Sequence, residues 1–441
     1  MSPILLTLFP LRSPDAIRKT AAQLGWDLLQ YYKGNLTGMT PGILPGPPPA
    51  GPYYWWQAGA MWTTFIQYWA WTGDASHNDL VMQALQFQVG ENVDYMPRNV
   101  TASLGNDDQA FWGMAAMTAA EMKFPNPPED KPQWLELAQA VFNTQASPLR
   151  HDDKCNGGLR WQIPFSNTGY DYKNTIANGC FFNIGARLYR YTKNETYLDW
   201  AVKTWDWLAG VEYIDPETWA VYDGAHVQQN CTNINLLQFS YNNGILAHGA
   251  AFLYNTTGDE IWKTRVEKLV GAGLKTFFPD DIAVEIACER VGTCNADMVC
   301  FKGFVHRWYS VIMQLCPFMR ETIAPVLRTS AQAAIEQCVG GETGRACGLN
   351  WASGEYEGKT DAGRQMSAFA AVSALLIDEA PPPVTNTTGG ISKGNPNAGS
   401  GEDDDFSPLK PITTADRAGA GIVTVIMCGA VVGMFSFMSL D

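Results

Sequence analysis

The chain of 441 residues has few basic residues and very few histidines. Its 30 Lys and Arg are outnumbered by 44 Asp and Glu, which gives a net charge of −14. Nucleic-acid binding needs clustered positive charge to pair with phosphates, so this balance argues against that function. The five histidines show no metal-ligand spacing, and we expect no metal and no other cofactor. They are His77, His151, His226, His248 and His306.

Motifs of several large enzyme classes are also missing. The sequence has no phosphate-binding loop, no dinucleotide-binding fingerprint and no Gly-x-Ser-x-Gly nucleophile elbow. Few segments show the strict polar and apolar alternation that is typical of strands. A hydrophobic fraction of 46% nevertheless supports a sizeable core. The sequence therefore predicts a mainly helical protein without nucleotide chemistry.

Sequons and cysteines favour a secreted glycoprotein over a cytosolic chain with free thiols. A single Asn-x-Ser/Thr sequon is common by chance, but six together are informative. Nine of the ten cysteines precede residue 418, and an odd number leaves at least one unpaired. We expect this to be Cys180, which lies in an apolar helical segment. The six sequons are at Asn35, Asn99, Asn194, Asn230, Asn255 and Asn386.

The N-terminal end of the chain is a weak targeting signal, whereas the C-terminal end has the features of a complete one. Residues 1–14 form a weak signal region, because its apolar run is short and broken by proline, and we expect a truncated or misassigned start. Small residues at 397–401, a polar spacer at 402–417 and a hydrophobic tail at 418–441 follow the order of a GPI-anchor signal, whose tail is removed. A retained transmembrane helix is the alternative, although no basic flank follows. The expected location is the outer face of the plasma membrane or the cell wall, with membrane contact only through the anchor.

A helical repeat occupies most of the chain between these ends. Turns recur near residues 73, 126, 194, 258 and 318, roughly 50–70 residues apart, between a small-residue, aromatic-rich helix and an amphipathic one. Six such hairpins predict an all-α toroid over residues 15–378, with the small-residue helices inside; an open solenoid is the alternative. The Pro-, Gly-, Thr- and Ser-rich and acidic stretch at 379–417 is expected to be a linker that carries the anchor site.

Two adjacent carboxylates, Asp107 and Asp108, follow Asn106 at the start of one inner helix. Such a pair can act as nucleophile and acid/base on a glycosidic bond, because close carboxylates cannot both ionise easily and one stays protonated. The alternative is an ordinary helix start, since Asn and Asp are preferred caps and first-turn residues. A metal site like that of isoprenoid synthases is disfavoured, because Phe111 and Trp112 stand where a third acid would be needed.

Other inner helices also begin with aromatic and amide side chains, which would meet at one mouth of the toroid. Aromatic faces and amides suit the apolar face and hydroxyls of a sugar, although capping and core packing explain any single one as well. The loop from His151 to Trp161 contains a second acidic pair, Asp152-Asp153, which is best explained as a turn. The candidate substrate-binding residues are Trp56, Gln57, Trp112, Arg160, Trp161, Asn174, Asn178, Tyr241, Asn242 and Lys302.

In combination these motifs resemble glycoside hydrolase family 76, which contains endo-α-1,6-mannanases. The resemblance implies an (α/α)6 barrel and a retaining mechanism with Asp107 as nucleophile and Asp108 as general acid/base. The tail and the cysteines are most similar to the fungal GPI-anchored cell-wall branch. That branch implies α-1,6-linked mannose glycans or the GPI-core glycan as donor, and β-glucan as a candidate acceptor. The similar segments are Asn106–Gly113, Gly157–Gln162, Tyr172–Gly179, Tyr222–Gly224, Phe239–Gly244 and Phe301–Phe304.

The resemblance also implies a disulfide scheme and three alternative functions. The implied bridges are Cys155–Cys231, Cys288–Cys294 and Cys338–Cys347. Cys300 and Cys316 depart from the family pattern and are candidates for an extra, fourth bridge. Transglycosylation that links GPI proteins to wall glucan is expected first, hydrolysis by an endo-α-1,6-mannanase second, and a non-catalytic mannan-binding wall protein third. The intact aspartate pair argues against the third. The first two differ only in how well the acceptor site excludes water.

Overall fold

The computed structural model describes residues 8, 10–100, 104–401 and 414–438. The chain divides into two compact units, Met1–Glu402 and Asp403–Asp441. In the described part of the first unit, twelve α-helices form two layers. The inner layer consists of α2 (Trp55–Thr72), α4 (Asn106–Glu121), α6 (Thr175–Thr192), α8 (Ser240–Thr257), α10 (Phe301–Leu315) and α12 (Ala362–Ala374). The outer layer consists of α1 (Pro14–Leu29), α3 (Asn78–Phe87), α5 (Trp134–Ala146), α7 (Glu195–Gly210), α9 (Glu260–Phe277) and α11 (Arg320–Glu336).

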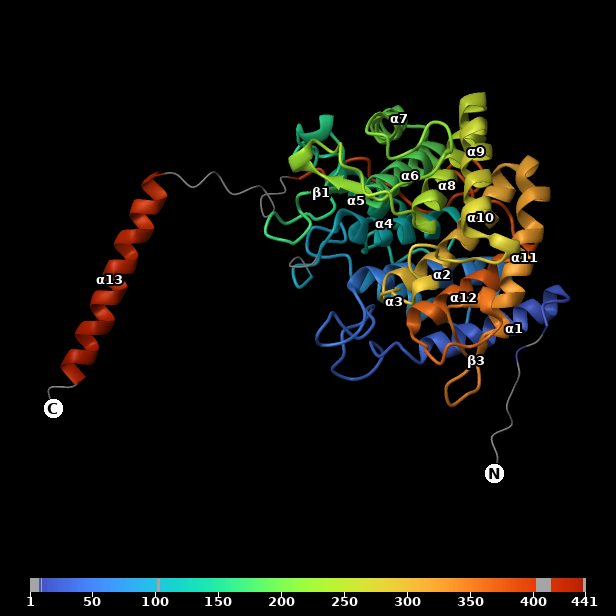
Figure 1. Ribbon diagram of the computed structural model, residues 1–441, viewed down its shortest axis with the longest axis horizontal. Coiled ribbons are helices and arrows are strands. Elements are labelled where there is room, and N and C mark those ends of the chain that lie inside the picture. The colour runs from blue at the N-terminus through green and yellow to red at the C-terminus, as the bar shows by residue number, and fades with distance from the viewer. Residues whose placement is uncertain (1–7, 9, 101–103, 402–413, 439–441) are drawn as a thin grey trace. The chain divides into compact units, whose positions relative to one another are not determined.

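The inner helices close into a ring. Each packs against the next one along the chain, and α12 completes the ring by packing against α2. In Figure 1, α7, α9 and α11 lie outside α6, α8 and α10. This arrangement confirms the (α/α)6 barrel of six hairpins, and the contact between α12 and α2 excludes the open solenoid.

Small residues allow the inner helices to pack closely against bulky neighbours. A Cβ on Gly59 would lie 3.0 Å from the Trp112 ring, and a Cβ on Gly113 would lie 2.8 Å from Val141. The two glycines therefore set the spacing of α2, α4 and α5. The N-terminal boundary is also as predicted, because the Ser13 hydroxyl accepts a hydrogen bond from the Ala16 amide at 3.3 Å and caps α1.

Chain direction defines two different ends of the barrel. All inner helices begin at one end, here called the mouth, and the outer helices return the chain to it from the opposite end, here called the floor. Most floor connections are short, apart from residues 122–133, and the mouth loops are long, for example residues 147–171 and 211–223. These loops hold two small antiparallel pairs, β1 (Tyr172–Asn174) with β2 (Gly224–His226) and β3 (Cys338–Gly340) with β4 (Ala346–Cys347). Long loops at one end of a rigid scaffold are where binding residues usually gather.

The three implied disulfides are present, and the candidate extra bridge is not. Cys155–Cys231, Cys288–Cys294 and Cys338–Cys347 are bonded, and Cys180 is free and buried, as predicted. Cys300 and Cys316 are also free and buried, so that pairing was wrong. They flank the 15 residues of α10, which hold them roughly 24 Å apart at 1.5 Å per residue. A disulfide needs Cα atoms within about 7 Å.

The segment expected to be a linker differs from that expectation in its first half. Residues 381–400 lie along the barrel and hydrogen-bond to it. The second unit contains α13 (Thr414–Met438), in which Arg417–Phe435 is long and apolar enough to cross a membrane. All six sequon asparagines are exposed, and their glycosylation stays a prediction.

Candidate active site

The start of α4 is fixed from several sides. The Asn106 amide donates to the Trp161 carbonyl at 2.8 Å, and the Asn106 side chain donates to the Arg160 carbonyl at 2.9 Å. Gln145 donates to the Asn106 carbonyl at 2.7 Å, and Arg150 donates to the Asn106 side-chain oxygen at 2.9 Å. The mouth loop and the end of α5 therefore hold the residue that precedes the aspartate pair.

Both carboxyl groups face free amides of the helix start. The Gly105 amide donates to Asp108 Oδ2 at 2.9 Å, and the Asp108 amide donates to Asp107 Oδ1 at 3.0 Å. A Cβ on Gly105 would collide with both carboxyls, so a larger residue here would displace them. The pair does cap the helix, and that capping also orients the two acids.

Burial and the interaction between the two carboxyl groups shift their pKa values to different extents. Burial raises the pKa of Asp107 to about 6, partly offset by hydrogen bonds from the Asp108 side chain and amide. Burial, the charge of Asp107 and a hydrogen bond to the Asp107 side chain raise the pKa of Asp108 well above its usual value. Burial therefore outweighs the preference of a helix N-terminus for anions. Near neutral pH, Asp107 is the ionised member, and Asp108 is the protonated one.

The pair lies in a cleft of about 700 Å³ at the mouth. Its described lining contains four aspartates, many aromatic and amide side chains, and no Lys, Arg or His. Such a surface fits a neutral or cationic ring-shaped ligand such as a sugar. The lining residues are Tyr54, Trp56, Asp107, Asp108, Phe111, Trp161, Gln162, Ser166, Asn167, Thr168, Tyr172, Asn174, Asp223, Phe239, Tyr241, Asn295, Asp297, Met298 and Phe301.

Four of the ten predicted binding residues line this cleft: Trp56, Trp161, Asn174 and Tyr241. The Tyr241 ring stacks on Phe301 with centroids 3.7 Å apart and an interplanar angle of 9°. Trp161 is 36% exposed and presents its indole at the rim. These side chains combine flat aromatic faces with amide donors and acceptors.

Three of the other six, Gln57, Asn178 and Lys302, support the scaffold and do not line the cleft. Gln57 accepts from the Tyr54 amide at 2.7 Å, and Asn178 exchanges hydrogen bonds with the backbone of Leu159. Lys302 is buried in an ion pair with Glu289 at 2.7 Å. These polar side chains at helix starts therefore form hydrogen bonds with backbone groups or pair with a buried charge.

Trp112, Arg160 and Asn242 complete this group. Trp112 is fully buried and stacks on Trp55, and Asn242 is also fully buried. Arg160 pairs with Asp152, which also accepts from Lys173 at 2.8 Å. Asp152 is therefore more than a turn residue, because it fastens the loop that carries Trp161 to the mouth.

Two acids of the cleft were missed from the sequence. Asp223 accepts from the Tyr172 hydroxyl at 2.7 Å, and Asp297 accepts from the Trp56 indole at 3.0 Å. Burial raises the pKa of both. Asp223 lies within the Tyr222–Gly224 motif and could have been selected, whereas the loop that contains Asp297 gives no pattern.

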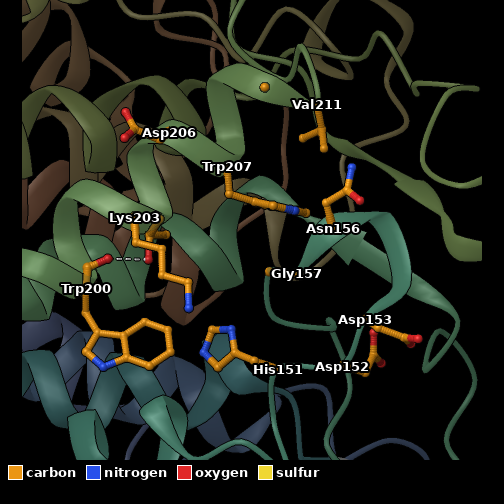
Figure 2. A pocket seen from close by; sticks show the side chains of 13 residues that line it. His151, Asp152, Asp153, Asn156, Gly157, Trp200, Lys203, Asp206, Trp207 and Val211 are labelled. Carbon is orange, nitrogen blue, oxygen red and sulfur yellow. Dashed lines mark hydrogen bonds between the residues drawn. The ribbon is translucent and has the colours of Figure 1, made fainter.

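A second cavity, of about 580 Å³, lies on the outer wall between the loop from His151 and α7. Figure 2 shows the His151 ring beside Trp200, with Lys203 close by. Burial lowers the pKa of His151 to about 4, so the ring is neutral at physiological pH. The two adjacent acids of this cavity differ from Asp107 and Asp108, because Asp152 is paired with Arg160 and Lys173 and Asp153 is exposed. The mouth cleft is therefore the candidate active site. Within the described residues no group of three or more His, Cys, Asp and Glu could hold a metal ion.

Comparison with known proteins agrees with this geometry. The sequence pattern of glycosyl hydrolase family 76 matches residues 16–387. The chain belongs to this family. It is 45% identical to the mannan endo-1,6-alpha-mannosidase DCW1 of Saccharomyces cerevisiae, over 94% of this chain and 91% of that protein. It is also 41% identical to DFG5 of the same yeast, over 96% and 92%.

Solved structures of the family share the fold. The crystal structure of Dfg5 from Chaetomium thermophilum, in complex with glucosamine, has a TM-score of 0.87 and 58% identity, and the match covers 89% of this chain and 97% of that chain. An inactive variant of the α-1,6-mannanase GH76A of Salegentibacter, in complex with α-1,6-mannotriose, has a TM-score of 0.65 and 19% identity over 82% and 99%. This family 76 chain is therefore a glycoside hydrolase by family and an (α/α)6 barrel by fold.

Proposed function

We propose that this enzyme cleaves α-1,6-linked mannose glycans with retention, takes the mannose core of GPI glycans as donor, and transfers it to β-glucan of a fungal wall. The paired aspartates of different protonation at the base of the mouth cleft carry this proposal. The curated relatives named above are mannan endo-1,6-α-mannosidases, and the similar Dfg5 structure contains glucosamine.

In the first step, ionised Asp107 attacks the anomeric carbon and forms a glycosyl ester. Protonated Asp108 gives its proton to the oxygen of the breaking glycosidic bond, which leaves as an alcohol. In the second step, Asp108, now ionised, takes the proton of an acceptor hydroxyl. The acceptor oxygen displaces Asp107 and restores the free enzyme. The raised pKa of Asp108 keeps it protonated for the first step.

Hydrolysis is the second candidate, and the names of the relatives favour it. Water and a sugar hydroxyl use the same second step, so the two functions differ only in the acceptor. The rim aromatics Tyr54 and Trp161 are exposed where an acceptor sugar would enter, which supports transfer.

The location is part of the same proposal. The apolar α13, the spacer and the small residues at 397–401 fit a GPI-anchor signal. The mature protein would then lie at the outer face of the plasma membrane or in the wall, with residues 418–441 removed. Release by a phosphatidylinositol-specific phospholipase tests this, and an intact peptide from 421–441 in the mature protein would exclude it.

Product masses separate the candidate functions. The protein is incubated with an α-1,6-linked mannose oligosaccharide and an excess of β-glucan oligosaccharide, with Asp107→Asn as the inactive control. Glucan chains extended by mannose support transfer, and shortened mannan alone supports hydrolysis. If neither product forms in the presence of folded wild-type protein, the catalytic assignment is wrong.

A further inference from the structure

Residues 381–400, here called the strap, first cross the floor of the barrel. The Val384 amide donates to the Glu121 carbonyl at 2.9 Å, at the floor end of α4. The Asn386 amide donates to the Tyr191 carbonyl at 3.2 Å, at the floor end of α6. Backbone contacts of this kind hold a segment in a defined position.

The strap then climbs the outer wall along α5, from floor to mouth. Ser392 accepts from the Leu135 amide at 2.9 Å, in the first turn of that helix. The Asn395 amide donates to the Gln139 side chain at 2.7 Å, one turn higher. Asn143 donates to the carbonyls of residues 396 and 398, at 2.8 and 2.7 Å. From Leu135 to Asn143 the helix rises roughly 12 Å, at 1.5 Å per residue.

Glycines make this docking close. A Cβ on Gly390 would collide with the Tyr191 hydroxyl, and a Cβ on Gly399 would collide with the backbone of Ala140. A Cβ on Gly394 would lie 2.6 Å from the Gln139 side chain. The glycines that made this segment look like a flexible linker instead allow its backbone to pack closely against the barrel.

The route of the strap changes the end of the barrel from which the chain leaves. The last barrel helix, α12, ends at the floor, so a chain without the strap would leave there. With the strap in place, the small residues at 397–401 lie beside Asn143. Two residues further on, Gln145 donates to the carbonyl of Asn106, which precedes the catalytic pair. The candidate anchor segment therefore lies at the mouth half of the wall.

We propose that the strap turns the mouth of the barrel toward the lipid surface that holds the anchor. The partner is the outer surface of a bilayer, where a lipid-linked glycan donor would face the cleft. This proposal rests on the proposed GPI anchor and donor. Mouth loops next to the strap and beyond it expose apolar side chains that suit the headgroup boundary, among them Leu149 (53% exposed), Phe165 (48%) and Leu236 (62%). The net charge of −14 does not favour attraction to anionic lipids.

Fluorescence quenching measures this orientation in the anchored protein. Leu236→Cys at the mouth and Ile261→Cys near the floor are each labelled with the same fluorophore; Cys428 lies in the tail that anchoring removes. The other free thiols are buried. A quencher attached to lipid headgroups should quench the mouth label several-fold more than the floor label, and phospholipase release should abolish both effects. Equal quenching, or stronger quenching at the floor, overturns the proposal.

A change in the strap tests its role. Asn143→Ala removes two contacts of the strap with α5, and about 15 Gly/Ser residues, which span roughly 20 Å on average, are inserted after Lys393 in the same variant. The same insertion after Gly73, in the floor turn between α2 and α3, is the matched control. The first insertion should remove the quenching difference and lower transfer from membrane-linked donor, while turnover of a soluble oligosaccharide donor stays unchanged. If the insertion unfolds the barrel, Asn143→Ala alone replaces it, with the same readouts. A strap variant that keeps the full quenching difference overturns the proposal. Wild-type protein inactive on the soluble donor overturns the proposed function instead.

Discussion

Asp107→Asn should abolish turnover and, at neutral pH, stabilise the protein. An amide cannot form the glycosyl ester, so the loss of activity should be at least about a thousandfold. The stabilisation follows from the buried charge. Burial raises the pKa of this carboxyl from 3.8 to about 6, so the native protein holds its proton more tightly than the unfolded chain does.

The sign and size of the effect follow from proton linkage. A raised acid pKa means that stability is highest below about pH 4 and declines as the pH rises toward 6. A shift of about two units corresponds to roughly 3 kcal/mol, as an upper bound. Asn removes the charge but keeps the oxygen that accepts from the Asp108 amide. The free energy of unfolding of the variant should therefore match wild type near pH 4 and exceed it by about 1–3 kcal/mol at pH 7.

Urea unfolding followed by tryptophan fluorescence, at several pH values between 4 and 7, measures this difference. Turnover of an α-1,6-mannoside is measured on the same preparations. Asp153→Asn, in an exposed loop, is the matched control and should change neither quantity. A helix cap with no catalytic role predicts the opposite result. Asp107→Asn would then lose up to about 1 kcal/mol at every pH and keep near-normal turnover, which would refute the reasoning.

Three further changes test other parts of the structure. Asp108→Asn should strongly reduce turnover of natural glycans but less that of a glycoside with an activated leaving group, and azide should partly restore the second step in a rate assay. Lys302→Met should destabilise the barrel by about 3–5 kcal/mol in denaturant unfolding, because it leaves Glu289 buried and unpaired, while KM of the residual folded enzyme stays unchanged. Alkylation without reduction should modify Cys300 and Cys316 only after unfolding, because both are free and buried. If neither cysteine is alkylated in the unfolded, non-reduced chain, the two form a disulfide after all.

Most of the fold could be predicted from the sequence, because the residues that specify it act over short distances along the chain. Turn residues at regular intervals and small residues along alternate helices specify hairpins and their inner faces. The aspartate pair was readable for the same reason, since Asp107 and Asp108 are adjacent at a helix start. Their relative protonation was not, because it depends on burial by residues distant in sequence.

The binding residues were only partly predictable. A polar side chain at a helix start can face the cleft, as Asn174 does, or hold a loop, as Asn178 does for Leu159. Sequence spacing does not distinguish the two, because the path of each mouth loop decides between them. Asp297 is in the cleft because its loop passes over α2, where the Trp56 indole donates to it. The strap was missed for a related reason: its partners are side chains of α5 far away in the sequence.

The basic residues near the mouth explain why Asp108 can remain an acid. A cation beside a carboxyl lowers its pKa, and Asp108 would then lose the proton that the leaving group needs. Arg160 and Lys173 are both paired with Asp152, and Lys302 is paired with Glu289. The described lining of the cleft accordingly holds no cation. The same three basic residues fasten the loops that shape the cleft, so the ion pairs both build the mouth and keep positive charge away from Asp108, the proposed acid.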